Sequence, residues 1–263
     1  MNLVTKDFEA AAAFLWNARI HKKPGEPLTK TYPSISVDDA YQVSRKNYQR
    51  RILEGARPIG KKIGLTSRAV QKQLGVDQPD FGYLTSDMII KDGGLLKRGS
   101  LIQGKAEGEV AFFLKKDLTS RDLKFEDIVS ATDFVVVCIE VIDSRIQDWK
   151  IKIEDTIADN ASSAFIVLGK EKKTLEQVDL KLAGMTLKKN GEIESTGVGA
   201  ACMDHPINAV LWLAQTMVKL DDPLRAGDCI LSGAYGPVVS FKEGDSCTVE
   251  INGLGFVSCS YEK

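Results

Sequence analysis

A run rich in β-branched residues, DFVVVCIEVI at positions 133–142, has the composition of a strand that is buried on both faces. Such a strand needs a neighbour on each side and cover above and below, so it must lie inside a sheet. Glu140 interrupts the run, and an ionised carboxylate in such a place costs several kcal/mol unless a cation lies beside it. The run therefore predicts a central strand that carries one paired charge.

Strands dominate the chain after residue 61. The expected strands share short lengths and mostly apolar or β-branched residues, bounded by turn-forming residues. They lie at residues 107–115, 133–142, 163–168 and 182–189, and near 228–232, 246–251 and 255–261. Asn190 and Gly191 favour a tight hairpin after the fourth of them. Many connections are too short for a helical crossover, which predicts an α+β fold built on a mixed β-roll or β-sandwich.

The first sixty residues favour helices. One amphipathic helix is expected over residues 6–20, and a second runs from Ser36, its N-cap, to about Leu53. We therefore expect an N-terminal helical segment over residues 1–60, followed by the β-roll over residues 61–263.

Two further helices are expected among the strands. A short one begins at Ser67 and stops at Gly75. A longer one begins at His205 and Pro206, because proline is favoured in the first turn of a helix. The second part of the chain is therefore not expected to be all-β.

Composition excludes several classes of protein. The formal net charge is −1 and the pI is near 6.2, whereas nucleic-acid-binding domains usually carry a basic surplus. No apolar stretch approaches about 18 residues, so no membrane span is expected, and the N-terminus lacks the basic start of a signal peptide. The five cysteines form no CxxC pair, which indicates reduced thiols in a cytoplasmic protein. Two histidines are too few for a histidine-rich metal site.

A pair of glutamates opens the strand expected at residues 107–115. Glu107 and Glu109 point to the same face of a strand, roughly 6.6 Å apart at their backbone positions. Taken alone, the pair fits a solvated strand face better than a binding site. With Glu140 the balance changes, because three acidic side chains and almost no histidine suit a hard cation such as Mg²⁺ or Mn²⁺. For Glu140 alone, an ion pair with Arg145 or with a lysine is the competing interpretation.

Two adjacent lysines precede an apolar segment, and strand alternation sends one of them inward and the other outward. An inward Lys61 or Lys62 could bind an anionic substrate or transfer protons, although two solvated lysines are the simpler interpretation. Asp80 in DQPDFG likewise has two interpretations: it belongs to an ordinary turn, or it serves as a general base. The segment 155–165 and the loop 231–238 either form turns or line an anion site with hydroxyl, amide and backbone N–H groups.

Four segments of the chain resemble one enzyme family. They are GKKIGLTSRAVQKQLGVDQPDFGYL, KAEGEVAF, EVIDSRIQDWKIKIEDTIADNAS and ILSGAYGPV. They are similar to the 2-hydroxypenta-2,4-dienoate hydratases, a branch of the fumarylacetoacetate hydrolase superfamily. That branch also contains 4-oxalocrotonate decarboxylases and 2-oxohept-4-ene-1,7-dioate hydratases. The resemblance runs from about residue 36 to the C-terminus, and it is more specific for the family than for the substrate.

The resemblance implies a β-roll fold with an N-terminal helical part, a cytoplasmic location and a homo-oligomer. It implies that residues 61–263 form a catalytic domain with a divalent metal, Mg²⁺ or Mn²⁺, bound by Glu107, Glu109 and Glu140. It also implies catalytic roles for Lys62 before IGLT, Asp80 in QPDFG and Ser162 after ADNA. The implied partners are a small 2-hydroxydienoate or 2-oxo acid substrate and a decarboxylase or aldolase of the same pathway.

The reaction that the resemblance implies is hydration of 2-hydroxypenta-2,4-dienoate (2-oxopent-4-enoate) to 4-hydroxy-2-oxopentanoate in meta-cleavage catabolism of aromatic compounds. The metal would bind the substrate's 1-carboxylate and 2-oxygen, and the dienol would first take up a proton at C5. Water would then add at C4. Lys62 and Asp80 are the candidates for proton transfer and water activation, in either assignment of roles.

Decarboxylation of 4-oxalocrotonate is the main alternative, because the same chelate would stabilise the same kind of enolate. Decarboxylases of the family tend to lack an acid at the position of Asp80, which favours the hydratase. Two further alternatives are a C–C hydrolase and a non-catalytic homologue. The hydrolase is disfavoured because neither His21 nor His205 lies in a matching motif. Relatives often carry Pro-Arg where this chain has Gly104-Lys105, so the forked geometry of arginine is lost there.

Overall fold

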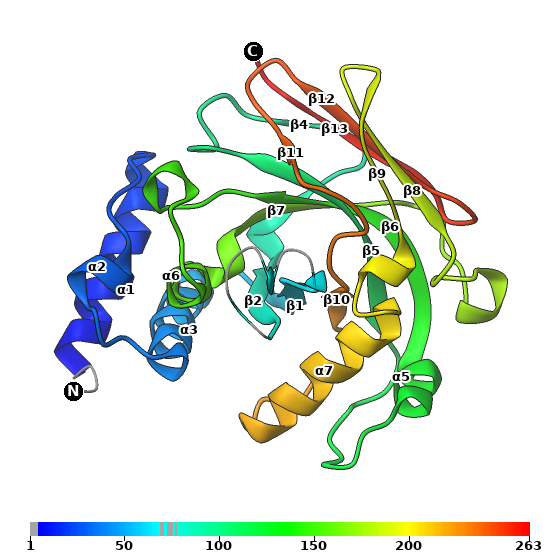
Figure 1. Cartoon of the computed structure of the whole chain (residues 1–263), viewed down its shortest axis with the longest axis horizontal. Coiled ribbons are helices and arrows are strands. Elements are labelled where there is room, and N and C mark those ends of the chain that lie inside the picture. Colours follow the sequence, from blue (N-terminus) through cyan, green and yellow to red (C-terminus); the bar gives the residue numbers. More distant parts are fainter. Residues whose placement is uncertain (1–4, 69–70, 73–75, 77) are drawn as a thin grey trace.

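The computed structural model of the chain describes residues 5–68, 71–72, 76 and 78–263. Two curved sheets form the body of the molecule, with one group of helices beside them and a second group below (Figure 1). No described helix is both long enough and apolar enough to cross a membrane. The short helix predicted over residues 67–75 falls largely outside the described residues.

The larger sheet has eight strands within the described residues, in the order β2-β1-β10-β5-β6-β7-β3, with β11 paired to β5. The bounds of these strands are Pro58–Gly64 (β1), Asp80–Thr85 (β2), Ile89–Ile90 (β3), Lys105–Leu114 (β5), Thr132–Ile142 (β6), Ser163–Leu168 (β7), Cys229–Leu231 (β10) and Val239–Ser240 (β11). The long antiparallel pair β5–β6 forms the middle of the sheet, and β6 is buried from Val135 to Ile142. The central strand predicted at residues 133–142 is confirmed.

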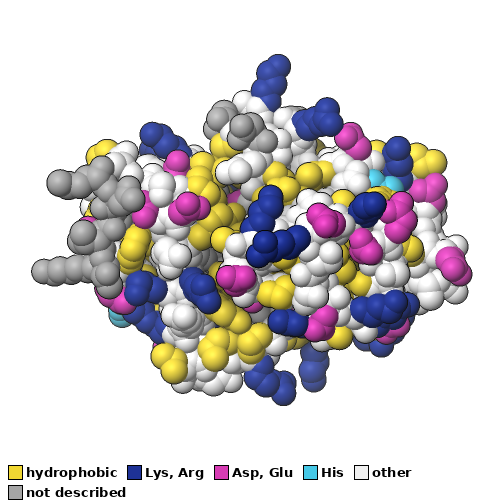
Figure 2. Space-filling model, turned by 90° about the horizontal axis from the view of Figure 1, so that it is seen from below, with side chains coloured by type: hydrophobic (Ala, Val, Ile, Leu, Met, Phe, Trp, Pro, Cys, Tyr) yellow, Lys and Arg dark blue, Asp and Glu magenta, His cyan; other side chains and the backbone are white. Residues whose placement is uncertain are grey.

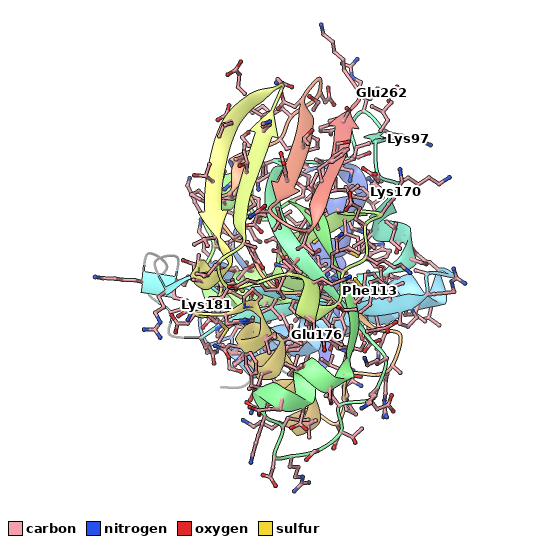
Figure 3. All side chains as sticks on the ribbon, turned by 90° about the vertical axis from the view of Figure 1, so that its right-hand side faces the viewer. Lys97, Phe113, Lys170, Glu176, Lys181 and Glu262 are labelled. Atoms are coloured by element: carbon pink, nitrogen blue, oxygen red, sulfur yellow. The ribbon has the colours of Figure 1, made fainter. Side chains whose placement is uncertain are left out.

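The smaller sheet has five strands among the described residues, in the order β4-β13-β12-β8-β9. Their bounds are Gly94–Leu96 (β4), Gly184–Lys189 (β8), Glu192–Val198 (β9), Ser246–Ile251 (β12) and Gly255–Tyr261 (β13). Asn190 and Gly191 join β8 to β9 with φ angles of 54° and 88°, as a two-residue hairpin turn requires, so the predicted hairpin is confirmed. Charged side chains, among them Lys97, Lys170 and Glu262, lie at the outer margin near β4 (Figure 3).

Strand alternation divides the side chains of β6 between two cores. Val137, Ile139 and Val141 face the smaller sheet and belong to the main apolar core. Gly108 on β5 faces the same way, and a Cβ there would lie 2.9 Å from the Val249 side chain, so only glycine permits this approach of the two sheets. By the same alternation Glu140 lies on the opposite face of β6, away from the smaller sheet.

The described helices form two groups. The first is α1 (Thr5–His21), α2 (Leu28–Thr31), α3 (Val37–Leu53) and α6 (Ile153–Ala158), and the second is α5 (Phe125–Ala131) and α7 (Pro206–Lys219). Five single turns of 3-10 helix occur in the part of the chain that the structure describes, at Ser86–Met88, Gln147–Trp149, Asn160–Ser162, Leu175–Gln177 and Gly199–Ala201. The Ser36 side chain caps α3 by accepting from the Asp39 N–H at 3.1 Å, which confirms the predicted N-cap.

The first helix group has a core of its own, separate from the core between the sheets. Ala12, Leu15, Ala40, Val43 and Ile157 are buried there. Helix α6 thus connects this group to β2 and the sheet. Helices α1, α3 and α7 match the predicted helices, whereas the short helices α2, α5 and α6 were not predicted. The observed combination of helices and mixed sheets confirms the predicted α+β fold.

Basic and acidic side chains are interspersed on the face shown in Figure 2, which is seen from below. That face carries no continuous basic stripe of the kind that binds a nucleic-acid backbone. All five cysteines are free and buried.

Candidate metal centre and active site

Three glutamates meet where β5 pairs with β6. The antiparallel register sets Glu107 directly opposite Glu140, and Glu109 follows on the same face of β5. One carboxylate oxygen from each residue lies within 4.8 Å of the other two. Glu140 is fully buried, Glu109 is 1% exposed and Glu107 is partly exposed. The Glu-x-Glu pattern alone favoured a solvated strand face, and that interpretation is therefore wrong.

The cluster holds more negative charge than its surroundings compensate. Burial and the neighbouring Glu140 raise the pKa of Glu107 to about 7, and the same causes raise the pKa of Glu109 well above its ordinary value. Glu109 accepts one hydrogen bond at 2.8 Å, from the Gly233 N–H. Neither carboxylate oxygen of Glu140 has a hydrogen-bond donor among the described residues. Buried carboxylate oxygens that accept no hydrogen bond, and three acidic side chains that meet at one point, fit the ligands of a hard divalent cation.

Lys62 supplies the positive charge closest to Glu140. It lies on β1, its ammonium is 3.3 Å from Glu140 Oε2, and it donates a hydrogen bond to the Ala161 carbonyl at 3.2 Å. Burial lowers the pKa of Lys62, but the carboxylates of Glu140 and Asp80 raise it more, so its pKa lies above the ordinary value. Lys62 is therefore cationic at neutral pH. The alternative partner for Glu140, Arg145, pairs with Asp159 instead.

The expectation that one of the two adjacent lysines is exposed to solvent is wrong. Alternation turns Lys61 to the opposite face from Lys62, yet it is also buried, with 7% of its surface exposed against 3% for Lys62. Its ammonium lies 3.3 Å from Asp222 Oδ2 and above the ring of Tyr83. The outward lysine of the pair was expected in solvent, but that face of β1 is covered as well.

Asp80 begins β2, directly across from Gly64 on β1, and is 1% exposed. Its Oδ2 accepts from the Thr156 hydroxyl at 3.5 Å, and its Oδ1 has no hydrogen-bond donor among the described residues. Burial raises the pKa of Asp80, although Lys62 opposes the shift. A Cβ on Gly64 would lie 2.2 Å from Asp80 Oδ1 and 3.1 Å from Lys62 Nζ, so this glycine allows the two charged groups to approach.

Ser162 lies beside this group on the turn that follows α6. Its hydroxyl is 3.5 Å from the hydroxyl of Thr156, the residue that also reaches Asp80. Thr156 is the site residue that sequence reasoning missed. Its only signal was its place in the polar segment 155–165, and no helix was predicted there to turn it inward.

The structure also places the loop 231–238 and the Gly104-Lys105 segment. The Gly233 N–H of the loop 231–238 does meet an anion, and that anion is Glu109. The Lys105 ammonium lies 4.1 Å from the centre of the Trp149 ring. A Cβ on Gly104 would lie 2.5 Å from Leu101, so no other residue fits this backbone position without movement.

Known proteins resemble this chain over nearly its full length. It is 49% identical over 254 residues to a 2-keto-4-pentenoate hydratase of Paraburkholderia xenovorans, covering 97% of this chain and 94% of that one. It is 46% identical over 237 residues to a 2-hydroxyhexa-2,4-dienoate hydratase of Comamonas testosteroni, with coverage of 89% and 90%.

Solved structures and a family model agree with these relatives. A 4-oxalocrotonate decarboxylase from Pseudomonas putida G7, complexed with magnesium and adipate, matches with a TM-score of 0.95 at 34% identity, covering 98% of both chains. The family model described as fumarylacetoacetate (FAA) hydrolase C-terminal matches residues 46–260. The chain therefore belongs to the fumarylacetoacetate hydrolase family.

Proposed function

We propose that this protein hydrates 2-hydroxypenta-2,4-dienoate (2-oxopent-4-enoate) to 4-hydroxy-2-oxopentanoate, in the meta-cleavage catabolism of aromatic compounds. The observation that carries the proposal is the cluster of Glu107, Glu109 and Glu140 with the buried Lys62 and Asp80 beside it. The hydratases named above support the same substrate class, since 2-keto-4-pentenoate is another name for 2-oxopent-4-enoate.

Glu107, Glu109 and Glu140 are the proposed ligands of a divalent cation, and the magnesium of the solved decarboxylase makes Mg²⁺ the first choice, with Mn²⁺ next. When bound, the cation supplies electrophilic stabilisation for negative charge on the oxygens of a 2-oxo acid. The three carboxylates otherwise repel one another, so a divalent cation also relieves their mutual repulsion.

Lys62 and Asp80 have different capacities for proton exchange. The raised pKa of Lys62 keeps its ammonium charged, so it is the proposed fixed positive charge beside the 2-oxygen of the substrate. Asp80 has a raised pKa, and its Oδ1 accepts no hydrogen bond from the described residues, so it is the proposed carrier of protons. It would donate its proton to C5 while the 2-hydroxyl proton passes to solvent, and later take a proton from the water that adds at C4. The enolate formed by that addition would take a proton from solvent at C3, so that one water is added in all and Asp80 ends protonated as it began. The Ser162 hydroxyl is the proposed donor to the substrate carboxylate.

Product analysis tests the proposal against its rivals. Purified protein with Mg²⁺ is given freshly generated 2-hydroxypenta-2,4-dienoate in one reaction and 4-oxalocrotonate in another. We expect 4-hydroxy-2-oxopentanoate from the first and no rapid carbon dioxide release from the second. Carbon dioxide release without hydration would assign the chain to the decarboxylases instead. Absence of both reactions, with no metal bound, would identify a non-catalytic homologue.

Four further features are proposed. The division at residue 60 into a helical segment and a catalytic β-roll rests on the family resemblance alone, because the core of the first helix group also includes Ile146 and Ile157 from beyond that boundary. A homo-oligomer, a cytoplasmic location and a pathway aldolase or decarboxylase as partner follow from the family. Size-exclusion chromatography coupled to light scattering tests the oligomer.

A further inference from the structure

Three consecutive residues between α6 and β7 have a left-handed backbone. The φ angles of Asn160, Ala161 and Ser162 are 60°, 48° and 54°. Such angles are uncommon outside glycine, and asparagine tolerates them better than alanine or serine does. A run of three persists only where the surrounding structure holds it. The turn 160–162 therefore depends on contacts with other parts of the chain.

This turn contributes two groups to the surroundings of Lys62 and Asp80. The Ala161 carbonyl accepts a hydrogen bond from the Lys62 ammonium at 3.2 Å, and the Ser162 hydroxyl lies 3.5 Å from that of Thr156. Thr156 in turn donates to Asp80 at 3.5 Å. A displacement of the turn would therefore move, at the same time, the acceptor that holds Lys62 and the hydroxyl proposed for the substrate carboxylate.

The side-chain amide of Asn160 fixes the turn to β2, which lies at an edge of the larger sheet as the structure describes it. The amide oxygen accepts from the Tyr83 N–H at 2.7 Å, and the amide nitrogen donates to the Tyr83 carbonyl at 3.0 Å. The oxygen also accepts from the Ser44 hydroxyl at 3.5 Å. A Cβ on Gly82 would lie 2.4 Å from the Asn160 carbonyl oxygen, so glycine permits this approach. Because β2 begins with Asp80, the amide sets the turn relative to that acid.

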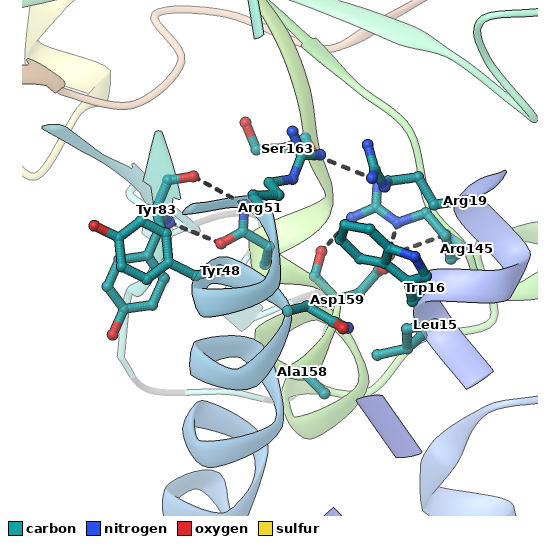
Figure 4. A pocket seen from close by; sticks show the side chains of 12 residues that line it. Leu15, Trp16, Arg19, Tyr48, Arg51, Tyr83, Arg145, Ala158, Asp159 and Ser163 are labelled. Carbon is teal, nitrogen blue, oxygen red and sulfur yellow. Dashed lines mark hydrogen bonds and ion pairs between the residues drawn. The ribbon is translucent and has the colours of Figure 1, made fainter. Parts of the chain in front are cut away.

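The two ends of the turn are held by a different residue. Arg145, which is buried, donates to the Asp159 carboxylate and carbonyl and, at 3.3 Å, to the Ser163 carbonyl. Figure 4 shows Arg145, Asp159, Ser163 and Tyr83 around the hollow that they line. Removal of Arg145 would leave the Asp159 carboxylate buried without its ion pair and would destabilise more than the turn. The Asn160 amide, in contrast, can be changed without removing a buried charge.

We propose that Asn160 is a positioning residue of the catalytic group. Its amide holds the turn 160–162 against β2, and through the turn it orients Lys62 and the Ser162 hydroxyl. Its two shorter hydrogen bonds go to the Tyr83 backbone, so it acts on the arrangement of the site without binding the metal. The effect on hydration rests on the proposed function, whereas the effect on the turn does not.

Hydrogen exchange of the metal-free protein tests the positioning without reference to activity. Asn160→Asp keeps an acceptor for the Tyr83 N–H and places a second oxygen against the Tyr83 carbonyl. In chelator, exchange in the peptide containing residues 159–163 should be about tenfold faster than in the wild type, because one hydrogen bond is lost. If Asn160→Asp does not fold, Asn160→Gly replaces it with the same expectations, because glycine accommodates a positive φ and lacks the amide.

Asn208→Asp is the matched control for these measurements. Asn208 is also partly buried, and its amide also donates to a backbone carbonyl, that of Met203, at 2.9 Å. It lies on α7, in the second helix group. The control should therefore lose the same kind of hydrogen bond and keep wild-type exchange in the peptide containing residues 159–163.

Steady-state kinetics with Mg²⁺ then separates positioning from a purely structural role. Asn160→Asp should lower kcat for the dienol about 30-fold, because a small misplacement of catalytic groups is costly. Calorimetry should find its Mg²⁺ affinity within about twofold of the wild type. Combined with Ser162→Ala, it should cost less than the product of the two separate losses, because both changes act on the same hydroxyl. Asn208→Asp should leave kcat unchanged.

Several results would overturn the proposal. They are unchanged exchange in residues 159–163, equally faster exchange there in Asn208→Asp, and faster exchange in Asn160→Asp with unchanged kcat. A loss of Mg²⁺ affinity above about tenfold, or kcat losses that multiply fully with Ser162→Ala, would do the same. A wild type that does not hydrate the dienol would instead refute the proposed function, and the exchange measurement would still decide whether Asn160 holds the turn.

Discussion

Replacement of Lys62 by methionine should expose how the charge of the glutamate cluster is compensated. Lys62 Nζ lies 3.3 Å from Glu140 Oε2, and both side chains are buried. At an effective dielectric constant of about 20, two unit charges at that separation attract by about 5 kcal/mol. Part of this offsets the desolvation of both charges, and removal of one partner of a buried pair typically costs about 3–5 kcal/mol. We expect Lys62→Met to lower the free energy of unfolding by about 3 kcal/mol in chelator.

Magnesium should reverse most of that loss. A divalent cation bound by the glutamates supplies the positive charge that the variant lacks. In the variant this cation no longer competes with the Lys62 ammonium for the Glu140 carboxylate. The deficit of Lys62→Met should therefore shrink to about 1 kcal/mol at saturating Mg²⁺, because a ligand that binds only the folded state stabilises it by mass action. Urea unfolding at about pH 8, followed by circular dichroism with chelator and with Mg²⁺, measures both values.

Lys61→Met is the matched control for this experiment. Lys61 is adjacent in the sequence, similarly buried, and 3.3 Å from a carboxylate, but that carboxylate is Asp222, whose side chain is 45% exposed. We expect a loss of about 1 kcal/mol that is the same with and without Mg²⁺. An equal deficit of Lys62→Met in both conditions, or a metal-dependent deficit of Lys61→Met, would refute the reasoning.

Three further predictions concern the catalytic group. Asp80→Asn should retain Mg²⁺ and slow hydration about 100-fold or more, and unchanged kcat would remove Asp80 from the mechanism. Gly64→Ala should push its new Cβ against Asp80 Oδ1 and lower kcat about 100-fold with unchanged metal content, as steady-state kinetics and metal analysis would show. Because burial and Glu140 raise the pKa of Glu107 to about 7, protons should compete with Mg²⁺ below that pH. Calorimetry should show that the affinity of the protein for Mg²⁺ falls about tenfold for each pH unit below 7, for every proton that Mg²⁺ displaces. An Mg²⁺ affinity that stays constant from about pH 6 to 8 would contradict this prediction.

The metal cluster could be predicted from the sequence because its signals are local and unusual. Glu140 interrupts an apolar run, and strand alternation alone puts Glu107 and Glu109 on one face. What alternation does not give is register, and it is the β5–β6 register that sets Glu107 opposite Glu140. The family resemblance supplied that pairing, and with it the roles of Lys62 and Asp80.

Other parts of the site depend on contacts between distant segments. Strands β1 and β2 are short and contain glycine and charged residues, so their composition did not distinguish them from turns. Lys61 was expected in solvent because periodicity does not reveal that a second layer covers that face. Thr156 was missed because its helix α6 has only six residues, and its position beside Asp80 comes from tertiary packing.

The absorbance of freshly generated 2-hydroxypenta-2,4-dienoate, followed with wild type and with Glu107→Ala, tests the central claim most directly. Chelator should stop the loss of the dienol by the wild type, and added Mg²⁺ should restore it. Glu107→Ala should remain folded, bind no metal and stay inactive at any Mg²⁺ concentration. Dienol loss that continues in chelator, or a Glu107→Ala variant that hydrates at the wild-type rate, would contradict the account.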